Sequence, residues 1–402
     1  MNNKIYFTPG PSELYPTVPQ HLQAAMAQKI GSISHRSQQF KDIYKHTEEG
    51  LRQLLQLPDN FEILFLSSAN EIWERAIQNT VEQESFHLVN GSFSKRFYEI
   101  ARELGRQAEK HEVSFGQGFD IDNLEIPGAA ELIAVVQNET SSGAATPVAE
   151  INKIRAKSNP EALVFVDAVS SMPHPAFDYN QIDAVYFSVQ KCFGLPAGLG
   201  VWILNNRCIA KADAMQTKGI SLGSYHSIPA LLSKAKAFQN PETPNVLNIF
   251  LLGQVVAEMN KKGIDLIRQE TETKAQSIYD YLATSQNFET FVQNPAHRSA
   301  TTIVANTKVS SAEVIKKLAP FDMVVGSGYG NHKEAQIRIA NFPTHSISQV
   351  QALVYKLREL FGWFSWFLSV STWLYTINAE AFLNRKAFAF VIINGSIILA
   401  QI

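Results

Sequence analysis

The sequence predicts an α/β protein with a mainly parallel mixed sheet between helices, followed by a small C-terminal α+β domain. Two observations lead to this fold class. Between residues 15 and 255, short apolar runs alternate with polar helical segments, which is typical of βαβ units with helices on both faces of a sheet. Beyond residue 255 the pattern changes to one long helical stretch and then to shorter units.

The elements of the large domain follow from its apolar runs. Each run is short, rich in β-branched and aromatic residues and bounded by polar residues or glycine, as expected of buried strands. A polar helical segment over 147–157 separates two of them. The predicted strands span 61–66, 132–136, 163–166, 184–187 and 200–204.

The small domain is predicted from helical spacing and from helix start signals. Around 253–283 the pattern becomes long and helical, and within it 263–283 has apolar positions at helical spacing on a charged background. Ser310 with Glu313, and Ser346 with Gln349, match the capping box that opens a helix. We therefore predict four segments, namely an N-terminal arm at 1–14, a large domain at 15–255, a small domain at 256–362 and an apolar tail at 363–402.

Composition excludes several classes of protein. The net charge is −2 and no basic run with interleaved aromatic residues is present, so no nucleic-acid partner is expected. Two cysteines, Cys192 and Cys208, fit a reduced cytoplasmic protein rather than a disulfide framework. The N-terminus has no apolar stretch of signal-peptide length, and no HExxH or paired CxxC spacing predicts a metal site.

The lysine at position 191 stands between two predicted core strands. Burying an ammonium group is costly, so one interpretation is a lysine in a surface loop, and the other is an amine used chemically as a Schiff base. Thr140, Asp167 and Lys191 each follow one of three successive strands. Because ligands of open α/β sheets bind at the carboxyl ends of the strands, we expect these three side chains to share one crevice.

Pyridoxal phosphate is the cofactor that such a set of residues favours. A lysine forms the imine, an acid keeps the pyridine nitrogen protonated, and a hydroxyl can bond the ring oxygen. The phosphate needs backbone N–H groups at the start of a helix, and the small polar residues after strand 61–66 supply such a start. Gly-x-Gly-x-x-Gly and Gly-Lys-Ser/Thr motifs, which would favour dinucleotides or nucleotide phosphates, are absent.

Several segments resemble the class V aminotransferases of PLP fold type I, and are most similar to the phosphoserine aminotransferases among them. The similar segments are FTPGPSELYP, SHRSQQF, NETSSG, VFVDAVSS and the Gln-Lys pair before a Gly- and Pro-rich turn. The resemblance covers about residues 1–362. It implies a homodimer that transfers amino groups between glutamate and a small keto acid, as phosphoserine:2-oxoglutarate aminotransferase in serine biosynthesis. The alternatives are alanine- or serine-glyoxylate transamination, cysteine desulfuration and, outside the enzymes, PLP binding without catalysis.

The resemblance also implies roles for individual residues. Lys191 would form the Schiff base, Asp167 would bind the pyridine nitrogen, Thr140 the ring oxygen, and Phe93 would stack on the ring. Arg338 would bind the substrate α-carboxylate. The cofactor phosphate would contact Ala69, Asn70, Gln190 and, from the second subunit, Thr243, while His35 and Arg36 would read the distal anion of the substrate across the dimer.

The sequence departs from the family pattern at four places, the first of which is Phe93, where the family usually has Trp. Ser141 and Ser142 follow the Asn-Glu-Thr motif where Ile-His is common, and Glu242 precedes Thr243 where the family has Asn. A carboxylate near a phosphate is unfavourable, so Glu242 must point away or be offset by a cation. No phosphate-binding His-Arg pair matches near Arg338; His332 and Lys333 lie close by as candidates, with a solvated loop as the other interpretation.

The last forty residues differ in composition from the rest of the chain. Three of the five tryptophans lie there, and the only charged residues are Glu380, Arg385 and Lys386. Its two apolar runs, 363–377 and 387–402, are each shorter than the roughly 20 residues that a spanning helix needs. We expect an adventitious extension rather than a membrane anchor, and full solubility and activity for a chain that ends at Gly362.

Overall fold

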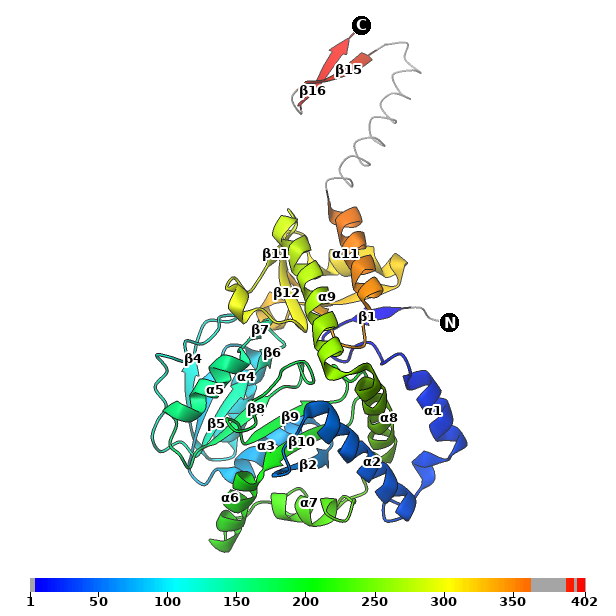
Figure 1. The fold of residues 1–402 in the computed structure, drawn as a ribbon. Coiled ribbons are helices and arrows are strands. Elements are labelled where there is room, and N and C mark those ends of the chain that lie inside the picture. Colours follow the sequence, from blue (N-terminus) through cyan, green and yellow to red (C-terminus); the bar gives the residue numbers. More distant parts are fainter. Residues whose placement is uncertain (1–3, 363–387, 394–395, 402) are drawn as a thin grey trace.

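The computed structural model describes residues 4–362, 388–393 and 396–401, and Figure 1 shows their arrangement. A seven-stranded sheet and a five-stranded sheet account for most of the strands. None of the helices within these ranges is long and apolar enough to cross a membrane.

The seven-stranded sheet confirms the predicted fold class. Its strands are parallel except β10, which is antiparallel to both of its neighbours. The central strands are buried along their whole length, because side chains cover both faces. In spatial order the strands are β2 (Phe61–Leu66), β10 (Gly200–Asn205), β9 (Ala184–Ser188), β8 (Leu163–Asp167), β5 (Leu132–Val136), β3 (Glu84–Val89) and β4 (Gln107–Glu112).

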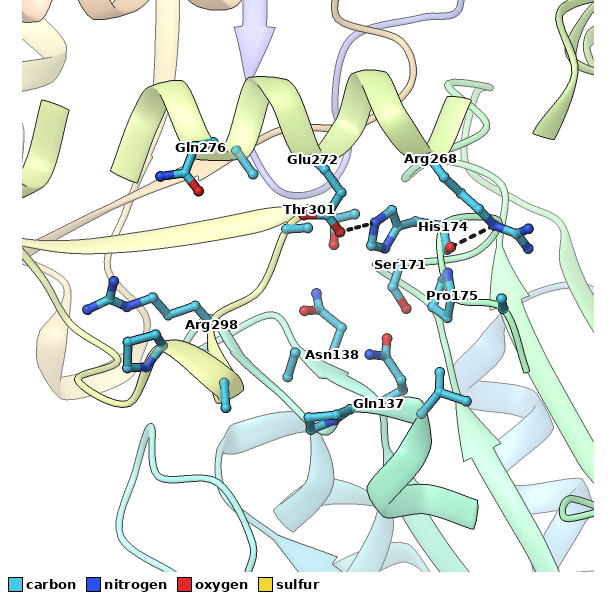
Figure 2. Close-up of a pocket in the computed structure, with 18 of the residues that line it drawn as sticks. Gln137, Asn138, Ser171, His174, Pro175, Arg268, Glu272, Gln276, Arg298 and Thr301 are labelled. Carbon is cyan, nitrogen blue, oxygen red and sulfur yellow. Dashed lines mark hydrogen bonds and ion pairs between the residues drawn. The ribbon is translucent and has the colours of Figure 1, made fainter. Parts of the chain in front are cut away.

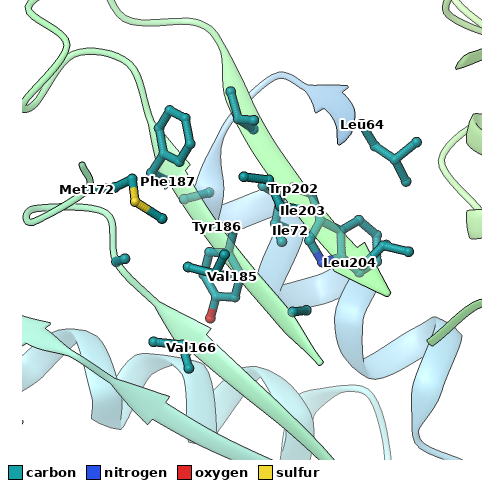
Figure 3. Close-up of a cluster of buried hydrophobic side chains, with 14 of the residues drawn as sticks. Leu64, Ile72, Val166, Met172, Val185, Tyr186, Phe187, Trp202, Ile203 and Leu204 are labelled. Carbon is teal, nitrogen blue, oxygen red and sulfur yellow. The ribbon is translucent and has the colours of Figure 1, made fainter. Parts of the chain in front are cut away.

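Helices pack against this sheet along its length. Helix α3 (Ala69–Thr80) contacts β9 and β10, and α4 (Ser92–Glu103) contacts β3 and β5. Figure 3 shows the apolar packing at the centre, where Tyr186 of β9 is the register partner of Trp202 of β10. The remaining helices of this part are α1 (Val18–Ala27), α2 (Gln38–Leu55), α5 (Val148–Lys157), α6 (Asn206–Thr217), α7 (Ile228–Ala235) and α8 (Val246–Lys262).

The five-stranded sheet has its own apolar core. Strand β1 pairs with β13 in parallel, although β1 belongs to the predicted N-terminal arm, and the other pairings are antiparallel. Helices α9 (Ile264–Thr284), α10 (Ser311–Leu318) and α11 (Ile347–Phe361) pack with it. The strands lie in the order β1 (Ile5–Phe7), β13 (Met323–Ser327), β14 (Gln336–Ala340), β12 (Thr302–Thr307) and β11 (Phe288–Thr290).

Two predicted features of the small domain differ in detail from the structure. The helical stretch over 253–283 is two helices, α8 and α9, because Gly263 has a φ of 86° and interrupts the helical backbone. Ser346 and Gln349 form the full capping box. Ser310 only accepts from the Glu313 amide, since the Glu313 carboxylate pairs with Lys317 at 3.0 Å instead of turning back.

The predicted domain bounds stay a prediction. Helix α8 runs through the predicted boundary at 255/256, and its side chain Met259 still belongs to the core of the seven-stranded sheet. The core of the five-stranded sheet includes Ala275 of α9. The change from one core to the other therefore falls inside α9.

The predicted tail at 363–402 lies outside the described residues except for two strands. These are β15 (Phe388–Ile393) and β16 (Ser396–Gln401), which pair with each other in an antiparallel register. Neither pairs with a strand of the two larger sheets.

Candidate functional site

Strands β5, β8 and β9 are neighbours, and the residues after them meet at one cavity. Its volume is about 310 Å³, within the size range of small-molecule pockets. Seven predicted site residues line it, and the closeness that the sequence predicted for Thr140, Asp167 and Lys191 is present. The seven are Ala69, Asn70, Phe93, Thr140, Asp167, Gln190 and Lys191.

Lys191 is a buried lysine, 9% exposed. Its Nζ donates to the backbone oxygen of Pro9 and lies 5.9 Å from the centroid of the Phe93 ring. Burial, and then the nearby Arg338 charge, lower the pKa of Lys191 to about 8. A neutral amine is therefore accessible near neutral pH, and a neutral amine is a nucleophile.

Gly10 allows this lysine to approach the N-terminal arm. Its φ is 141°, and a Cβ at this position would lie 2.2 Å from the Lys191 Nζ. Any side chain would thus both strain the backbone and displace the amine. The arm forms one wall of the cavity through Gly10 and Pro11.

Asp167 is a buried carboxyl at the end of β8, 3% exposed. It accepts hydrogen bonds from Trp73 Nε1 at 2.8 Å and from the Val169 amide at 2.9 Å. Burial raises the pKa of Asp167 to about 7, although these two hydrogen bonds act in the opposite direction. The carboxyl can thus gain or lose a proton near neutral pH.

Phe93 is held in place through Glu139. The Glu139 carboxylate is fully buried and accepts from the amides of Phe93 at 3.3 Å and Ser94 at 2.9 Å. A negative charge at the N-terminus of α4 is favourable. The acid of the Asn-Glu-Thr motif therefore fixes the first turn of the helix that carries the Phe93 ring.

Two serines position the polar groups of the cavity wall. The Thr140 hydroxyl donates to Ser170 Oγ at 2.7 Å, and the Ala69 amide donates to Ser188 Oγ at 2.9 Å. Ser68 caps α3 by accepting from the Glu71 amide at 3.2 Å. The helix thus starts beside the cavity, where its first amides suit an anion.

Arg338 lies beside the cavity rather than in its lining. Its Nε donates to the Ser327 oxygen at 2.8 Å and Nη1 to the Thr140 oxygen at 3.3 Å. The guanidinium packs on Tyr329, 5.3 Å from the ring centroid, and Tyr329 lies 5.3 Å from Phe93. These contacts leave further N–H groups of Arg338 for a carboxylate.

The other predicted residues lie elsewhere on the same chain. Arg36 donates to Gln239 Oε1 at 2.8 Å and to the backbone oxygens of Asn240 and Pro241. His35, next to it, is half-buried, and Thr243 is exposed. His332 stacks on Phe115 with centroids 4.8 Å apart, while Lys333 is exposed. None of these five lines the Lys191 cavity.

A cation offsets the unusual Glu242. His226 forms an ion pair with Glu242 at 3.0 Å and a second ion pair with Glu71 of α3. Glu242 and Glu71 together raise the pKa of His226 to about 9. Burial acts to raise the pKa of Glu71, but hydrogen bonds from His226 and Ser67 outweigh it and lower this pKa to about 2.

Sequence reasoning missed the residues that support the site. Trp73, Ser188 and Tyr329 act through contacts between elements, and no motif marks them. Ser170 lies within the segment VFVDAVSS, but nothing in that segment indicates its contact with Thr140. Within the part of the chain that the structure describes, no group of three or more His, Cys, Asp or Glu is placed to hold a metal ion. Cys192 and Cys208 are free thiols and both are buried.

Taken as chemistry, the cavity combines four kinds of group. A buried amine, a buried acid, an aromatic ring and a helix start surround one space, and a guanidinium stands beside it. Such a set suits a carbonyl compound that carries an anionic group, because the amine can add to the carbonyl.

Comparison with known proteins gives consistent results. The family model described as aminotransferase class-V matches residues 5–347. A phosphoserine aminotransferase of Rhodococcus opacus is 28% identical over 348 residues, 86% of this chain and 91% of that protein. A crystal structure of a phosphoserine aminotransferase from Cytophaga hutchinsonii is 59% identical, with a TM-score of 0.89, covering 89% of this chain and 99% of that one.

A more distant match supports the fold alone. The ureidoglycine–glyoxylate aminotransferase of Bacillus subtilis is 19% identical, with a TM-score of 0.76, over 90% of this chain and 93% of that one.

Proposed function

The chain belongs to the class-V aminotransferase family, and on that premise we propose that it acts as a phosphoserine:2-oxoglutarate aminotransferase of serine biosynthesis. It would transfer the amino group between glutamate and a keto acid that carries a phosphate. The observation that carries the proposal is the buried Lys191 amine, which lies beside Asp167 and Thr140 in a chain 59% identical to a phosphoserine aminotransferase.

Pyridoxal 5′-phosphate is the cofactor that the residues of the cavity fit. Lys191 would bind its carbonyl carbon, and the Phe93 ring, against which the Lys191 amine already lies, would stack on its ring. Asp167 and Thr140 would hold the ring nitrogen and ring oxygen. Ala69, Asn70 and Gln190, at the start of α3 and after β9, would hold the phosphate.

When bound, the cofactor supplies an electron-accepting ring that stabilises negative charge at the substrate Cα. The chain's own residues do the rest. Lys191 would take a proton from the substrate Cα as general base and, as general acid, deliver it to the cofactor carbon that carries the amino group, which its lowered pKa favours. Asp167 would stay ionised opposite the protonated ring nitrogen, and Arg338 would orient the α-carboxylate.

A homodimer accounts for the predicted residues that lie away from the cavity. His35, Arg36 and Thr243 do not line the Lys191 cavity of their own chain, and the family resemblance implies that they serve the site of the second subunit. Arg36 is bonded to the segment just before Thr243. We infer that both are presented together to the site of the partner subunit, in a cytoplasmic enzyme.

A panel of keto acids tests the substrate. The purified chain, loaded with cofactor and glutamate, is offered 3-phosphohydroxypyruvate, pyruvate, glyoxylate and oxaloacetate, and the rate of amino transfer is measured for each. We expect kcat/KM to be greatest for the phosphorylated acid. A larger value for glyoxylate would replace the proposal by a glyoxylate aminotransferase of the same family.

The variant Arg36→Ala tests whether Arg36 binds the distal anionic group of the substrate. It should lose activity with glutamate and phosphorylated acids while retaining part of its activity with alanine, which has no distal anion. Equal losses for alanine and glutamate would contradict that role.

Cysteine desulfuration is disfavoured, because burial raises the pKa of both Cys192 and Cys208 and keeps both thiols from a substrate.

A further inference from the structure

A second cavity, larger than the one that contains Lys191, lies between α9 and the residues that follow the central strands β5 and β8. Its volume is about 680 Å³. Figure 2 shows side chains from α9, from the loop after β8 and from the hairpin of β6 (Asn138–Glu139) and β7 (Ala144–Ala145) around it. The proposed transamination uses none of its polar residues. Among these are Gln137, Ser171, His174, Arg268, Glu272 and Arg298.

Two buried polar atoms on its wall have no hydrogen-bond partner among the described residues. Ser171 is 2% exposed, and its Oγ forms no hydrogen bond in the described part of the chain. Gln137 is 7% exposed; its amide nitrogen donates to the Thr146 oxygen at 3.2 Å, but its Oε1 accepts from nothing within the described residues. An unsatisfied buried polar group costs about 1–3 kcal/mol, and such groups are rare in native proteins.

A carboxylate on α9 adds a negative charge to the same space. Glu272 is paired with His174 at 2.7 Å, and this hydrogen bond lowers the pKa of Glu272. In Figure 2, Glu272 and His174 lie across the cavity from Gln137, with Ser171 between them. The carboxylate and the Gln137 oxygen both accept hydrogen bonds, so a ligand here must carry a donor, and a cationic donor suits best.

Two guanidinium groups restrict the choice of ligand. Arg298 donates to the Val292 and Gln293 oxygens and packs on Tyr279 at 5.4 Å. Arg268 donates to the His174 oxygen at 3.1 Å. Each keeps further N–H groups. Their charges would repel a simple amine, but they would attract a carboxylate on the same molecule.

We propose that this cavity is a second binding site, for a small zwitterionic amino acid. Its ammonium group contacts Glu272, Gln137 Oε1 and Ser171 Oγ. Its carboxylate pairs with one of the two arginines of the wall, Arg268 or Arg298. The site is distinct from the Lys191 cavity but shares one lining residue with it, Asn138. Asn138 donates to Ser170 Oγ at 2.7 Å, the atom that also accepts from Thr140.

Calorimetric titration of the cofactor-loaded enzyme with glycine tests the proposal. Glycine is also expected to bind beside Arg338, so two binding events are predicted in the parent protein. Arg338→Lys should weaken only one of them. Glu272→Gln, which can still hydrogen-bond to His174, should weaken the other about twofold to fivefold, because Glu272 is exposed and water screens its charge. It should leave kcat/KM for glutamate unchanged.

Ser171→Ala provides a second variant, because it creates little space and removes a hydroxyl that has no hydrogen-bond partner in the part of the chain that the structure describes. It should weaken the same event as Glu272→Gln. Glu289→Gln, an exposed carboxylate that does not line the cavity, is the matched control and should change neither event. Glycolate and ethanolamine, which each lack one of the two charges, should bind more weakly than glycine at the event that Glu272→Gln affects.

Two outcomes would overturn the proposal. One is a single binding event in the parent protein that Arg338→Lys removes. The other is a second event that is insensitive to both Glu272→Gln and Ser171→Ala, or that ethanolamine or glycolate reproduces as well as glycine does.

Discussion

Replacing Asp167 by asparagine tests whether burial of this carboxyl sets its ionisation. Its pKa is raised from 3.8 to about 7, mainly by burial. Between these values the folded cofactor-free protein holds one proton more than the unfolded chain. Stability that Asp167 contributes is therefore complete below about pH 4 and is lost as the pH rises through about 7.

The magnitude follows from the width of that pH range. Each pH unit inside it costs about 1.4 kcal/mol, so the parent should lose about 3 kcal/mol between pH 5 and pH 8 relative to the Asp167→Asn variant. The variant has its own cost, since an amide has one acceptor oxygen for the two donors, Trp73 Nε1 and the Val169 amide. One unmet donor costs about 1–3 kcal/mol at every pH.

Urea unfolding of the cofactor-free proteins at pH 5, 6, 7 and 8 measures this difference. Asp213→Asn, on the exposed side of α6, is the matched control. From pH 5 to pH 8, the free energy of unfolding of Asp167→Asn should rise by about 3 kcal/mol relative to that of the parent. The control should show the same pH dependence as the parent. Parallel profiles for all three proteins would refute the raised pKa.

In the loaded enzyme the same variant should lose on the order of 10² to 10⁴ in rate, and a loss under tenfold would contradict a contact with the ring nitrogen.

Three further predictions concern other charged groups. Lys191→Ala should lose the visible absorbance of bound cofactor and nearly all turnover, and near-normal turnover would show that another group binds the cofactor. Arg338→Lys should raise KM for every amino donor, because an ammonium group cannot form a bidentate pair with a carboxylate; an unchanged KM would exclude the α-carboxylate role. His226→Gln should lower the melting temperature most below about pH 6.5, because the raised pKa of His226 keeps its ion pairs with Glu71 and Glu242 until the pH passes about 9. Melting curves at pH 6 and 9.5 check this, and an equal loss at both would be inconsistent with a charged imidazole.

Much of the large sheet was predictable from sequence, because its central strands are continuous apolar runs. The prediction of 132–136 has the bounds of β5, and that of 184–187 is one residue short of β9. Strand β1 was not predicted as a strand, since three residues carry little periodicity and the partner of Ile5 is Met323, far along the chain. The break at Gly263 was missed because apolar spacing continues on both sides of it.

The candidate site was predictable where function leaves polar residues at the ends of buried strands. Thr140, Asp167 and Lys191 could be found in this way, and they line one cavity. Trp73 and Ser170 could not, since each becomes a partner only when elements pack together. For Arg36, the sequence motif identifies the residue as a candidate. The orientation of its side chain could not be predicted, because it depends on the backbone oxygens to which the guanidinium donates. The roles of all these residues stay predictions.

The pairing of β1 with β13 has a consequence for how the chain is made. Ile5 pairs with Met323, so 318 residues (323 − 5) must be synthesised between the two halves of this contact. At about 5–20 residues per second, the first strand is synthesised roughly 15 to 65 s before its partner. The arm that brings the Pro9 oxygen to the Lys191 amine is anchored by that pairing. The large sheet can therefore fold during translation, but the lysine receives its final surroundings only after β13 has been synthesised.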